Sequence, residues 1–151
     1  MNDYKDNPVV REAYEWLGTP HVNQAKVKGH GIDCGMLLIA CLEGAGYIEK
    51  GAIEVPPYSN EWHLHHNDEW FLHIVERYCR EIPMDEIQPG DFLLYKYGRC
   101  VSHGAVYVGN GCVIHAMLDR GVIMSNLNEV IFLDAKGKSR LYGVYRFRRA
   151  E

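Results

Sequence analysis

The chain has 151 residues, a hydrophobic fraction of 47% and a charged fraction of 24%, which is typical of one ordinary globular domain. The formal net charge of −4 and the lack of a basic, aromatic-interleaved patch argue against a nucleic-acid partner. The longest apolar run is too short for a membrane span, and the polar, acidic start does not resemble a secretion signal. We therefore expect one domain over residues 1–151 that stays in the cytoplasm or leaves by a route that needs no signal.

The N-terminal half shows the apolar spacing of helices. Asn7-Pro8 is an N-cap followed by a proline at the first helical position, and Gly18 closes this first helix. A second helix is predicted from about Cys34 to Glu43, with Asp33 as its N-cap. It is apolar almost all round, so it should be central and buried. A third helix is predicted over roughly Asp68 to Arg80.

From residue 91 onward the apolar residues alternate, as in strands. The predicted strands are Phe92–Tyr97, His103–Val108, Cys112–Met117, Gly121–Met124, Val130–Leu133 and Tyr142–Phe147. Helices first and strands afterwards predict an α+β fold, in which N-terminal helices pack on a C-terminal antiparallel sheet of five to six strands.

Cys34 stands where the second helix begins, directly after Gly31-Ile32-Asp33. The unpaired N–H groups and the positive dipole end of a first helical turn favour a thiolate, which is the nucleophilic form of cysteine. A cysteine at the edge of an apolar helix is, taken alone, more often a small buried core residue. The neighbouring glycines, which leave room for a substrate backbone, and the rigid helix behind the thiol favour a nucleophile.

Two histidines, His103 and His115, lie on consecutive predicted strands, and small residues after His103 leave space at its ring. If the loop between the strands has two residues, the two rings face opposite sides of the sheet. If it has three, Val108 pairs with Cys112 and the rings are diagonal neighbours on one face. We predict the three-residue form, ending in a bulge with a left-handed Gly111, in which His115 can hydrogen-bond His103 and fix its tautomer.

Zinc binding is the alternative interpretation of the histidines, because Cys100-x-x-His103 and Cys112-x-x-His115 repeat a Cys-x-x-His pattern. Residues three apart on a strand point to opposite faces, so we expect neither a metal site nor a cofactor. The histidine-rich segment 62–66 is expected to cap the third helix or to line the rim of the cleft. The five cysteines are odd in number and widely spaced, which argues against a disulfide framework.

In combination, these motifs resemble the NlpC-type cell-wall peptidases, which are papain-like cysteine enzymes. The matching residues are Asp33-Cys34, the Gly-Ala-Val-Tyr-Val-Gly strand opened by His103, and Ile114-His115-Ala116. Further segments are similar to the branch found with bacteriophage tails and gene-transfer particles: Trp16–Pro20, Val55–Ser59, Gln88–Asp91 and Tyr142–Arg146. The resemblance covers nearly the whole chain and implies a papain-like fold.

The resemblance implies that Cys34 is the nucleophile, His103 the general base and His115 the residue that orients the base. It also implies hydrolysis of peptide bonds in peptidoglycan stems, typically between D-γ-glutamyl and a diamino acid. Two positions depart from the family pattern: His21 replaces a tyrosine often found near the thiol, and Met36 replaces a common glycine. The residues expected to contact substrate are His21, Asp33, Gly35 and Ser102.

In a phage setting such an enzyme would open a local hole in the wall, with tail proteins as its partners. A cytoplasmic protein that is packaged into the virion would fit the missing signal sequence. Two other functions stay open. One is a tail-assembly or wall-binding module of the same fold without turnover. The other is an amidase or acyltransferase that uses the same thiol.

Overall fold

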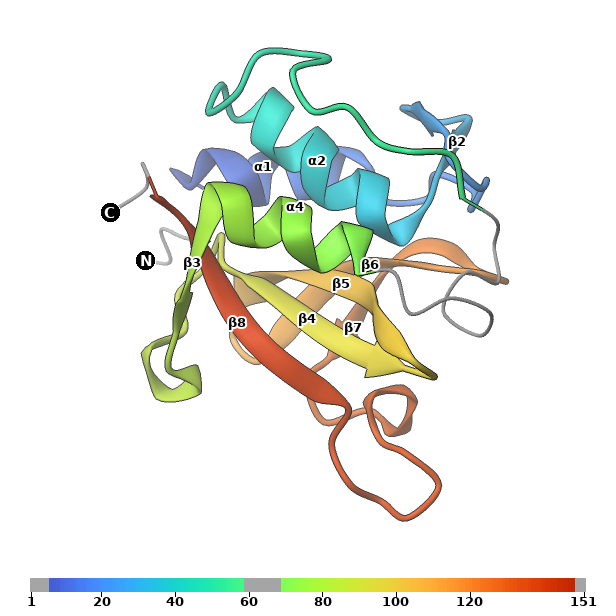
Figure 1. Ribbon diagram of the computed structural model, residues 1–151, viewed down its shortest axis with the longest axis vertical. Coiled ribbons are helices and arrows are strands. Elements are labelled where there is room, and N and C mark those ends of the chain that lie inside the picture. Colours follow the sequence, from blue (N-terminus) through green and yellow to red (C-terminus); the bar gives the residue numbers. More distant parts are fainter. Residues whose placement is uncertain (1–5, 59–68, 149–151) are drawn as a thin grey trace.

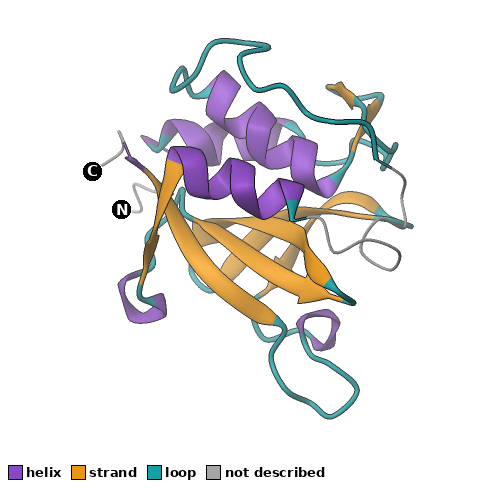
Figure 2. Cartoon of the chain, viewed as in Figure 1, coloured by secondary structure: helices purple, strands orange, loops and turns teal. Residues whose placement is uncertain are grey.

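The computed structural model describes residues 6–58 and 69–148. Within them, three helices lie together against one face of an antiparallel sheet (Figures 1 and 2). The helices are α1 (Pro8–Glu15), α2 (Cys34–Gly44) and α4 (Trp70–Tyr78). The sheet has the spatial order β3-β8-β4-β5-β6-β7 and consists of β3 (Cys79–Ile82), β4 (Phe92–Tyr97), β5 (Cys100–Gly109), β6 (Cys112–Met117), β7 (Gly121–Asn126) and β8 (Leu141–Phe147). The predicted α+β class and the packing of helices on an antiparallel sheet are confirmed.

Shorter elements complete the described chain. A two-stranded ladder of β1 (Lys26–Val27) and β2 (Gly31–Ile32) leads into α2, and the 3-10 turns are η2 (Met84–Glu86) and η3 (Val130–Phe132). No helix in the described ranges is both long and apolar enough to cross a bilayer.

Helix α2 is the centre of the helical layer, as its all-round apolar sequence predicts. It contacts α1 as well as strands β5 and β6. Gly104 on β5 allows the close approach of the layers, because a Cβ there would lie 2.8 Å from both Leu38 Cδ2 and Phe71 Cζ. The small residue after His103 therefore makes room for the helices. Gly104 therefore does not supply the space expected at the histidine ring, whereas Ala105, the next small residue, lies on the same face as His103.

Both faces of the sheet are buried. Along β4, Phe92 and Leu94 belong to the main core beneath the helices. The alternate residues, Leu93 and Tyr95, belong to a second cluster on the opposite face, which η3 covers with Phe132. This second face carries the histidines, since Tyr95 pairs directly with His103.

The turn between β5 and β6 differs from its prediction. Gly109 pairs with Cys112, so the loop is the two-residue Asn110-Gly111, with φ of +57° and +72° as in a type I′ turn. A bulge that adds Val108 to β5 then shifts the register, so that Val106 pairs with Ile114. His103 and His115 consequently share a face as predicted, although the three-residue loop proposed for it is wrong.

Two predicted element boundaries are also corrected. The third helix ends at Tyr78, before the predicted Arg80, because Cys79–Ile82 pairs with β8 as the edge strand β3. The segment Val130–Leu133 was expected to be a strand but is mostly the 3-10 turn η3. Its Val130 is 80% exposed, whereas Phe132 is buried and stacks on Tyr95 at 4.5 Å between ring centroids. Packing of one aromatic ring outweighs the β-propensity of the segment.

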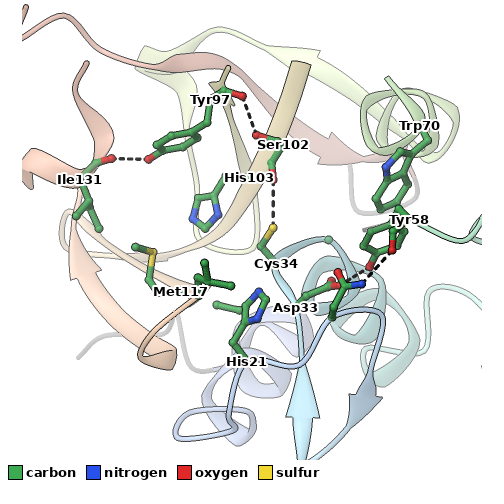
Figure 3. A pocket seen from close by; sticks show the side chains of 14 residues that line it. His21, Asp33, Cys34, Tyr58, Trp70, Tyr97, Ser102, His103, Met117 and Ile131 are labelled. Atoms are coloured by element: carbon green, nitrogen blue, oxygen red, sulfur yellow. Dashed lines mark hydrogen bonds between the residues drawn. The ribbon is translucent and has the colours of Figure 1, made fainter. Parts of the chain in front are cut away.

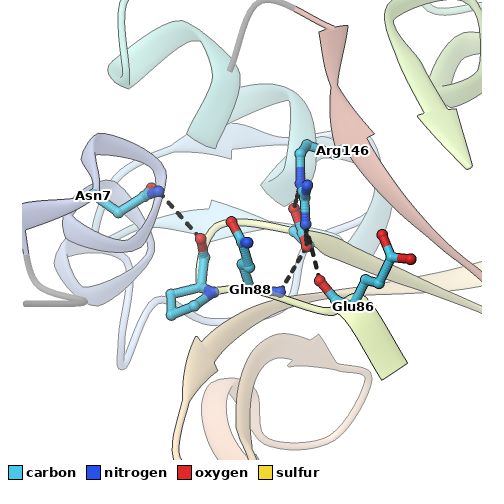
Figure 4. Close-up of polar contacts among 6 residues, drawn as sticks. Asn7, Glu86, Gln88 and Arg146 are labelled. Carbon is cyan, nitrogen blue, oxygen red and sulfur yellow. Dashed lines mark hydrogen bonds and ion pairs between the residues drawn. The ribbon is translucent and has the colours of Figure 1, made fainter. Parts of the chain in front are cut away.

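A largely buried ion pair joins the loop before β4 to strand β8 (Figure 4). Asp91 accepts hydrogen bonds from Nε and Nη2 of Arg146, both at 2.8 Å, and from the backbone N–H of Gln88. Nearby, Asn7 caps α1 and donates to the carbonyl of Pro89 at 3.1 Å. These contacts attach the start of the first helix to the loop that enters β4.

Candidate active site

A cavity of about 350 Å³ opens where the N-terminus of α2 meets strand β5 and the turn after β6. Helical and loop residues line one part of it: His21, Asn23, Asp33, Cys34, Gly35, Tyr58 and Trp70. Residues of the sheet, its turns and η3 line the rest: Tyr97, Ser102, His103, Ala116, Met117, Leu118 and Ile131. The cavity thus brings together segments that lie far apart in the sequence.

Cys34 is the first residue of α2, and its side chain points into this cavity (Figure 3). Its Sγ donates a hydrogen bond to the carbonyl of Ser102 at 3.2 Å. Ser102 is the extra residue of a bulge in β5, because Tyr95 pairs with His103 whereas Lys96 pairs with Val101. The bulge turns a backbone carbonyl toward the thiol.

The resting thiol is neutral. Burial raises the pKa of Cys34 to about 12, and the negative charge of Asp33 acts in the same direction. The backbone N–H groups of Gly104, Gly35 and Cys34 itself oppose the shift. The helix N-terminus therefore favours the thiolate, as expected, but desolvation outweighs it, so the predicted fall in pKa does not occur.

His103 and His115 form a hydrogen-bonded pair. His103 Nε2 lies 2.8 Å from His115 Nδ1, and the ring planes meet at 75°. His115 Nε2 lies 2.8 Å from the hydroxyl of Ser125 on β7. The expected contact between the two rings is present. It occupies Nε2 of His103 and leaves Nδ1 as the nitrogen that can serve the cavity.

Aromatic rings enclose this pair and keep it uncharged. Tyr97 meets the His103 ring edge-on at 5.7 Å between centroids, and Phe132 lies 5.2 Å from the His115 ring. Burial, followed by the neighbouring His115 and His21, lowers the pKa of His103 to about 3. Burial likewise lowers the pKa of His115 to about 4. Two neutral imidazoles therefore stand beside a neutral thiol.

Asp33 holds the entry to α2 in place, which confirms the predicted N-cap. Its carboxylate accepts the backbone N–H groups of Met36 at 2.9 Å and Gln24 at 2.7 Å, and also the hydroxyl of Tyr58. Tyr58 in turn stacks on Trp70 at 4.5 Å between centroids. With its oxygens engaged in this way, Asp33 forms part of the cavity wall and orients the tyrosine that shares it.

The structure brings most of the predicted site residues to one place. Six of them line the cavity: His21, Asp33, Cys34, Gly35, Ser102 and His103. His115 lies behind His103 and reaches the cavity only through it. His21 is half-buried, and desolvation lowers the pKa of its ring. The predicted histidine-rich segment 62–66 lies outside the described residues.

Several residues of the site escaped the sequence analysis. Tyr58, Trp70 and Tyr97 line the cavity, and Ser125 bonds to His115. Periodicity offered a signal for Ser125, a polar residue at an inward-facing position of the strand that follows His115. Tyr58 lies in a proline-rich connector, where sequence periodicity carries no information.

The cysteines of the repeated Cys-x-x-His pattern do not gather with the histidines. Cys100 is buried in the main core, and Sγ of Cys112 contacts the carbonyl of Asn110 at 3.7 Å. Across residues 6–58 and 69–148, no group of three or more histidine, cysteine, aspartate or glutamate side chains could hold a metal ion.

Comparison with known proteins agrees with this architecture. The chain is 28% identical over 145 residues to the gamma-DL-glutamyl hydrolase of Bacillus subtilis (strain 168), which covers 94% of the chain but only 29% of that relative. It is 32% identical over 50 residues to the murein DD-endopeptidase MepS/murein LD-carboxypeptidase of Escherichia coli (strain K12), covering 33% of the chain and 27% of that relative. The matched segments thus cover less than a third of either relative.

Among solved structures, the NlpC/p60 domain of the peptidoglycan hydrolase SagA superposes with a TM-score of 0.61 at 20% identity, covering 93% of this chain and 97% of that one. This likeness shows the shared fold. The sequence profile of the NlpC/P60 family matches residues 11–140, which is most of the chain. The chain therefore belongs to the NlpC/P60 family.

Proposed function

We propose that this chain is a cysteine peptidase that hydrolyses amide bonds in peptidoglycan stem peptides, of the type that cuts between D-γ-glutamyl and a diamino acid. One observation carries the proposal: Cys34, at a helix N-terminus, and His103, whose Nδ1 has no hydrogen-bond partner among the described residues, line the same cavity. The name of the Bacillus subtilis relative refers to γ-glutamyl hydrolysis, and that of the Escherichia coli relative to murein peptides. Both names support this class of substrate.

The reaction uses groups that the cavity already contains. His103 Nδ1 accepts the proton of Cys34, and Sγ attacks the carbonyl carbon of the scissile amide. Because burial disfavours the charged forms of both groups, moving the proton as the sulfur attacks avoids a buried thiolate–imidazolium pair. The backbone N–H of Cys34 can donate to the developing oxyanion, a type of contact worth about 3–4 kcal/mol of barrier in other enzymes.

The leaving amine then takes the proton from the His103 imidazolium, which leaves an acyl group on Sγ. Water adds to this thioester, gives its proton to His103, and releases the acid product and the free thiol. His115 keeps the ring of His103 oriented through both proton transfers.

Digestion of purified peptidoglycan tests the proposal. The parent protein should release cleaved stem peptides, whereas Cys34→Ala should fold normally and release none. Cys112→Ser is the matched control, since this partly exposed cysteine lies outside the cavity lining and its loss should leave the rate unchanged. Cleavage by Cys34→Ala at the parental rate would refute the assignment.

Mass spectrometry of the products separates the competing functions. Cleaved stem peptides, lactyl-amide products and acyl-transfer products differ in mass, so an amidase or acyltransferase would be recognised directly. A folded parent protein that binds peptidoglycan without any turnover would indicate a wall-binding module.

The association with phage tails is a separate part of the proposal. It is supported by the segments Trp16–Pro20 and Gln88–Asp91, which are similar to those of the tail-associated branch. We expect an antibody against this chain to label purified tail particles; particles free of the chain would contradict the association and leave the peptidase assignment untouched.

A further inference from the structure

The hydroxyl of Ser125 lies at the end of a chain of hydrogen bonds that begins at His103. Ser125 is 4% exposed, and its Oγ lies 2.8 Å from His115 Nε2. In the ladder of β6 and β7, His115 pairs with Ile123 and Val113 pairs with Ser125. Ser125 is therefore a diagonal neighbour of His115 on the face that carries the two rings.

Only one arrangement of the hydrogens in this series of hydrogen bonds lets His103 accept the proton of the Cys34 thiol. A neutral imidazole carries a single N–H. Because His103 Nε2 is hydrogen-bonded to His115 Nδ1, Nδ1 is the nitrogen of His103 that has no partner among the described residues, and a base must have it unprotonated. His103 then holds its hydrogen on Nε2 and donates it to His115 Nδ1. His115 in turn holds its hydrogen on Nε2 and donates it to Ser125 Oγ.

The reverse arrangement satisfies the same distances but blocks the base. Ser125 would then donate to His115 Nε2, and His115 Nδ1–H would donate to His103 Nε2. His103 would carry its hydrogen on Nδ1, toward the cavity, where it could not accept a proton. The two states differ only in the direction of the hydrogen bonds. The group that is hydrogen-bonded to His115 Nε2, at the end of this series of bonds, therefore decides between them.

We propose that Ser125 is a positioning residue that accepts the hydrogen of His115 Nε2 and thereby holds both imidazoles in the tautomer that a base at His103 requires. The inference rests on the proposed function of Cys34 and His103. In this arrangement the hydroxyl hydrogen of Ser125 points away from His115. Alanine at this position would remove the acceptor and leave His115 free to move its hydrogen to Nδ1.

Nitrogen-15 spectra of protein labelled at histidine test this directly, because the shifts of the two ring nitrogens report which one carries the hydrogen. In the parent protein we expect His103 and His115 both to carry it on Nε2. In Ser125→Ala we expect a substantial fraction of His115 with the hydrogen on Nδ1. A parent protein in which His115 carries its hydrogen on Nδ1 would overturn the proposal without any variant.

Kinetics provide the second measurement. Ser125→Ala should lower kcat by about 10- to 100-fold, the range seen when a metal-bound histidine loses its outer partner, with KM nearly unchanged. In the same variant, the rate at which iodoacetamide alkylates Cys34, measured by peptide mass spectrometry, should fall in parallel with kcat. Ser125→Thr keeps the hydroxyl and should restore both rates, and Ser139→Ala, an exposed serine, is the neutral control.

Three results would count against Ser125: a parental kcat in Ser125→Ala, a lowered kcat with parental tautomers, or a folded Ser125→Thr as slow as the alanine variant. Failure of the proposed function has a different signature. If the parent protein cleaves no muropeptide, the peptidase assignment fails, while the nitrogen-15 spectra and the alkylation rates still decide whether Ser125 sets the tautomers.

Discussion

Mild acid should destabilise this protein through its two buried histidines. In the folded protein the pKa is about 3 for His103 and about 4 for His115, mainly because burial disfavours the charged rings. In the unfolded chain a histidine has a pKa of about 6.5. Between these values the unfolded state binds more protons than the folded state, so lowering the pH favours unfolding.

The size of the effect follows from these pKa values. At pH 5 almost every unfolded histidine is protonated, whereas both folded rings are still largely neutral. Relative to pH 7.5, each ring then lowers the free energy of unfolding by about 2 kcal/mol, and the pair by about 4 kcal/mol. That is a large part of the 5–15 kcal/mol, roughly, that stabilises an ordinary domain. Carboxylates add little in this window, because their stabilising charge is lost at lower pH.

Urea denaturation at pH 7.5 and pH 5 measures the effect. His115→Gln should lose about half of the pH-dependent change that the pair contributes, whatever it does to stability at pH 7.5. His30→Gln, which alters an exposed histidine, should leave the change as it is in the parent. If His115→Gln and the parent lose the same free energy of unfolding between the two pH values, the buried rings are not the cause of the acid sensitivity.

Two further predictions concern packing around the site. Asp91→Asn removes the buried carboxylate beside Arg146 and should lower the free energy of unfolding in urea by about 3–5 kcal/mol, whereas Arg148→Gln, at an exposed guanidinium, should change it little. Gly104→Ala forces a methyl group against Leu38 and Phe71; it should cost about 1–3 kcal/mol in the same assay and slow muropeptide cleavage, because α2 carries the thiol. Parental stability in either variant would contradict the packing described here.

The parts of the fold that depend on apolar periodicity could be predicted from sequence. Helix α2 begins at Cys34 as expected, since Asp33 has the side chain of an N-cap and every following turn is apolar. Strands β4 and β6 have the predicted bounds, because each is a short, mostly apolar run bounded by turn residues. These three elements carry the thiol and His115, and they support the strand of His103.

Other parts depend on contacts between distant segments. Cys79–Ile82 continues a helical pattern and becomes a strand only because β8 is available to pair with it. Phe132 leaves the strand conformation in order to stack on Tyr95. The cavity residues Tyr58 and Trp70 meet through one stacked contact across a gap of twelve positions. No local pattern encodes such partners, and tertiary packing overrides propensity where they form.

Two bulges in β5 explain why His103 and His115 share a face as predicted, although the predicted three-residue loop between β5 and β6 is wrong. A two-residue turn in a regular ladder would place His115 opposite Val106, which belongs to the core beneath the helices, so the ring would face away from His103. The extra Val108 cancels that shift and returns His115 to the other face. At the opposite end of β5, the extra Ser102 turns its carbonyl to the thiol while His103 stays paired with Tyr95. Because a bulge leaves no trace in apolar periodicity, the sequence can predict that the residues meet but not by which backbone irregularity, and it is these irregularities that set the positions of the thiol and both rings.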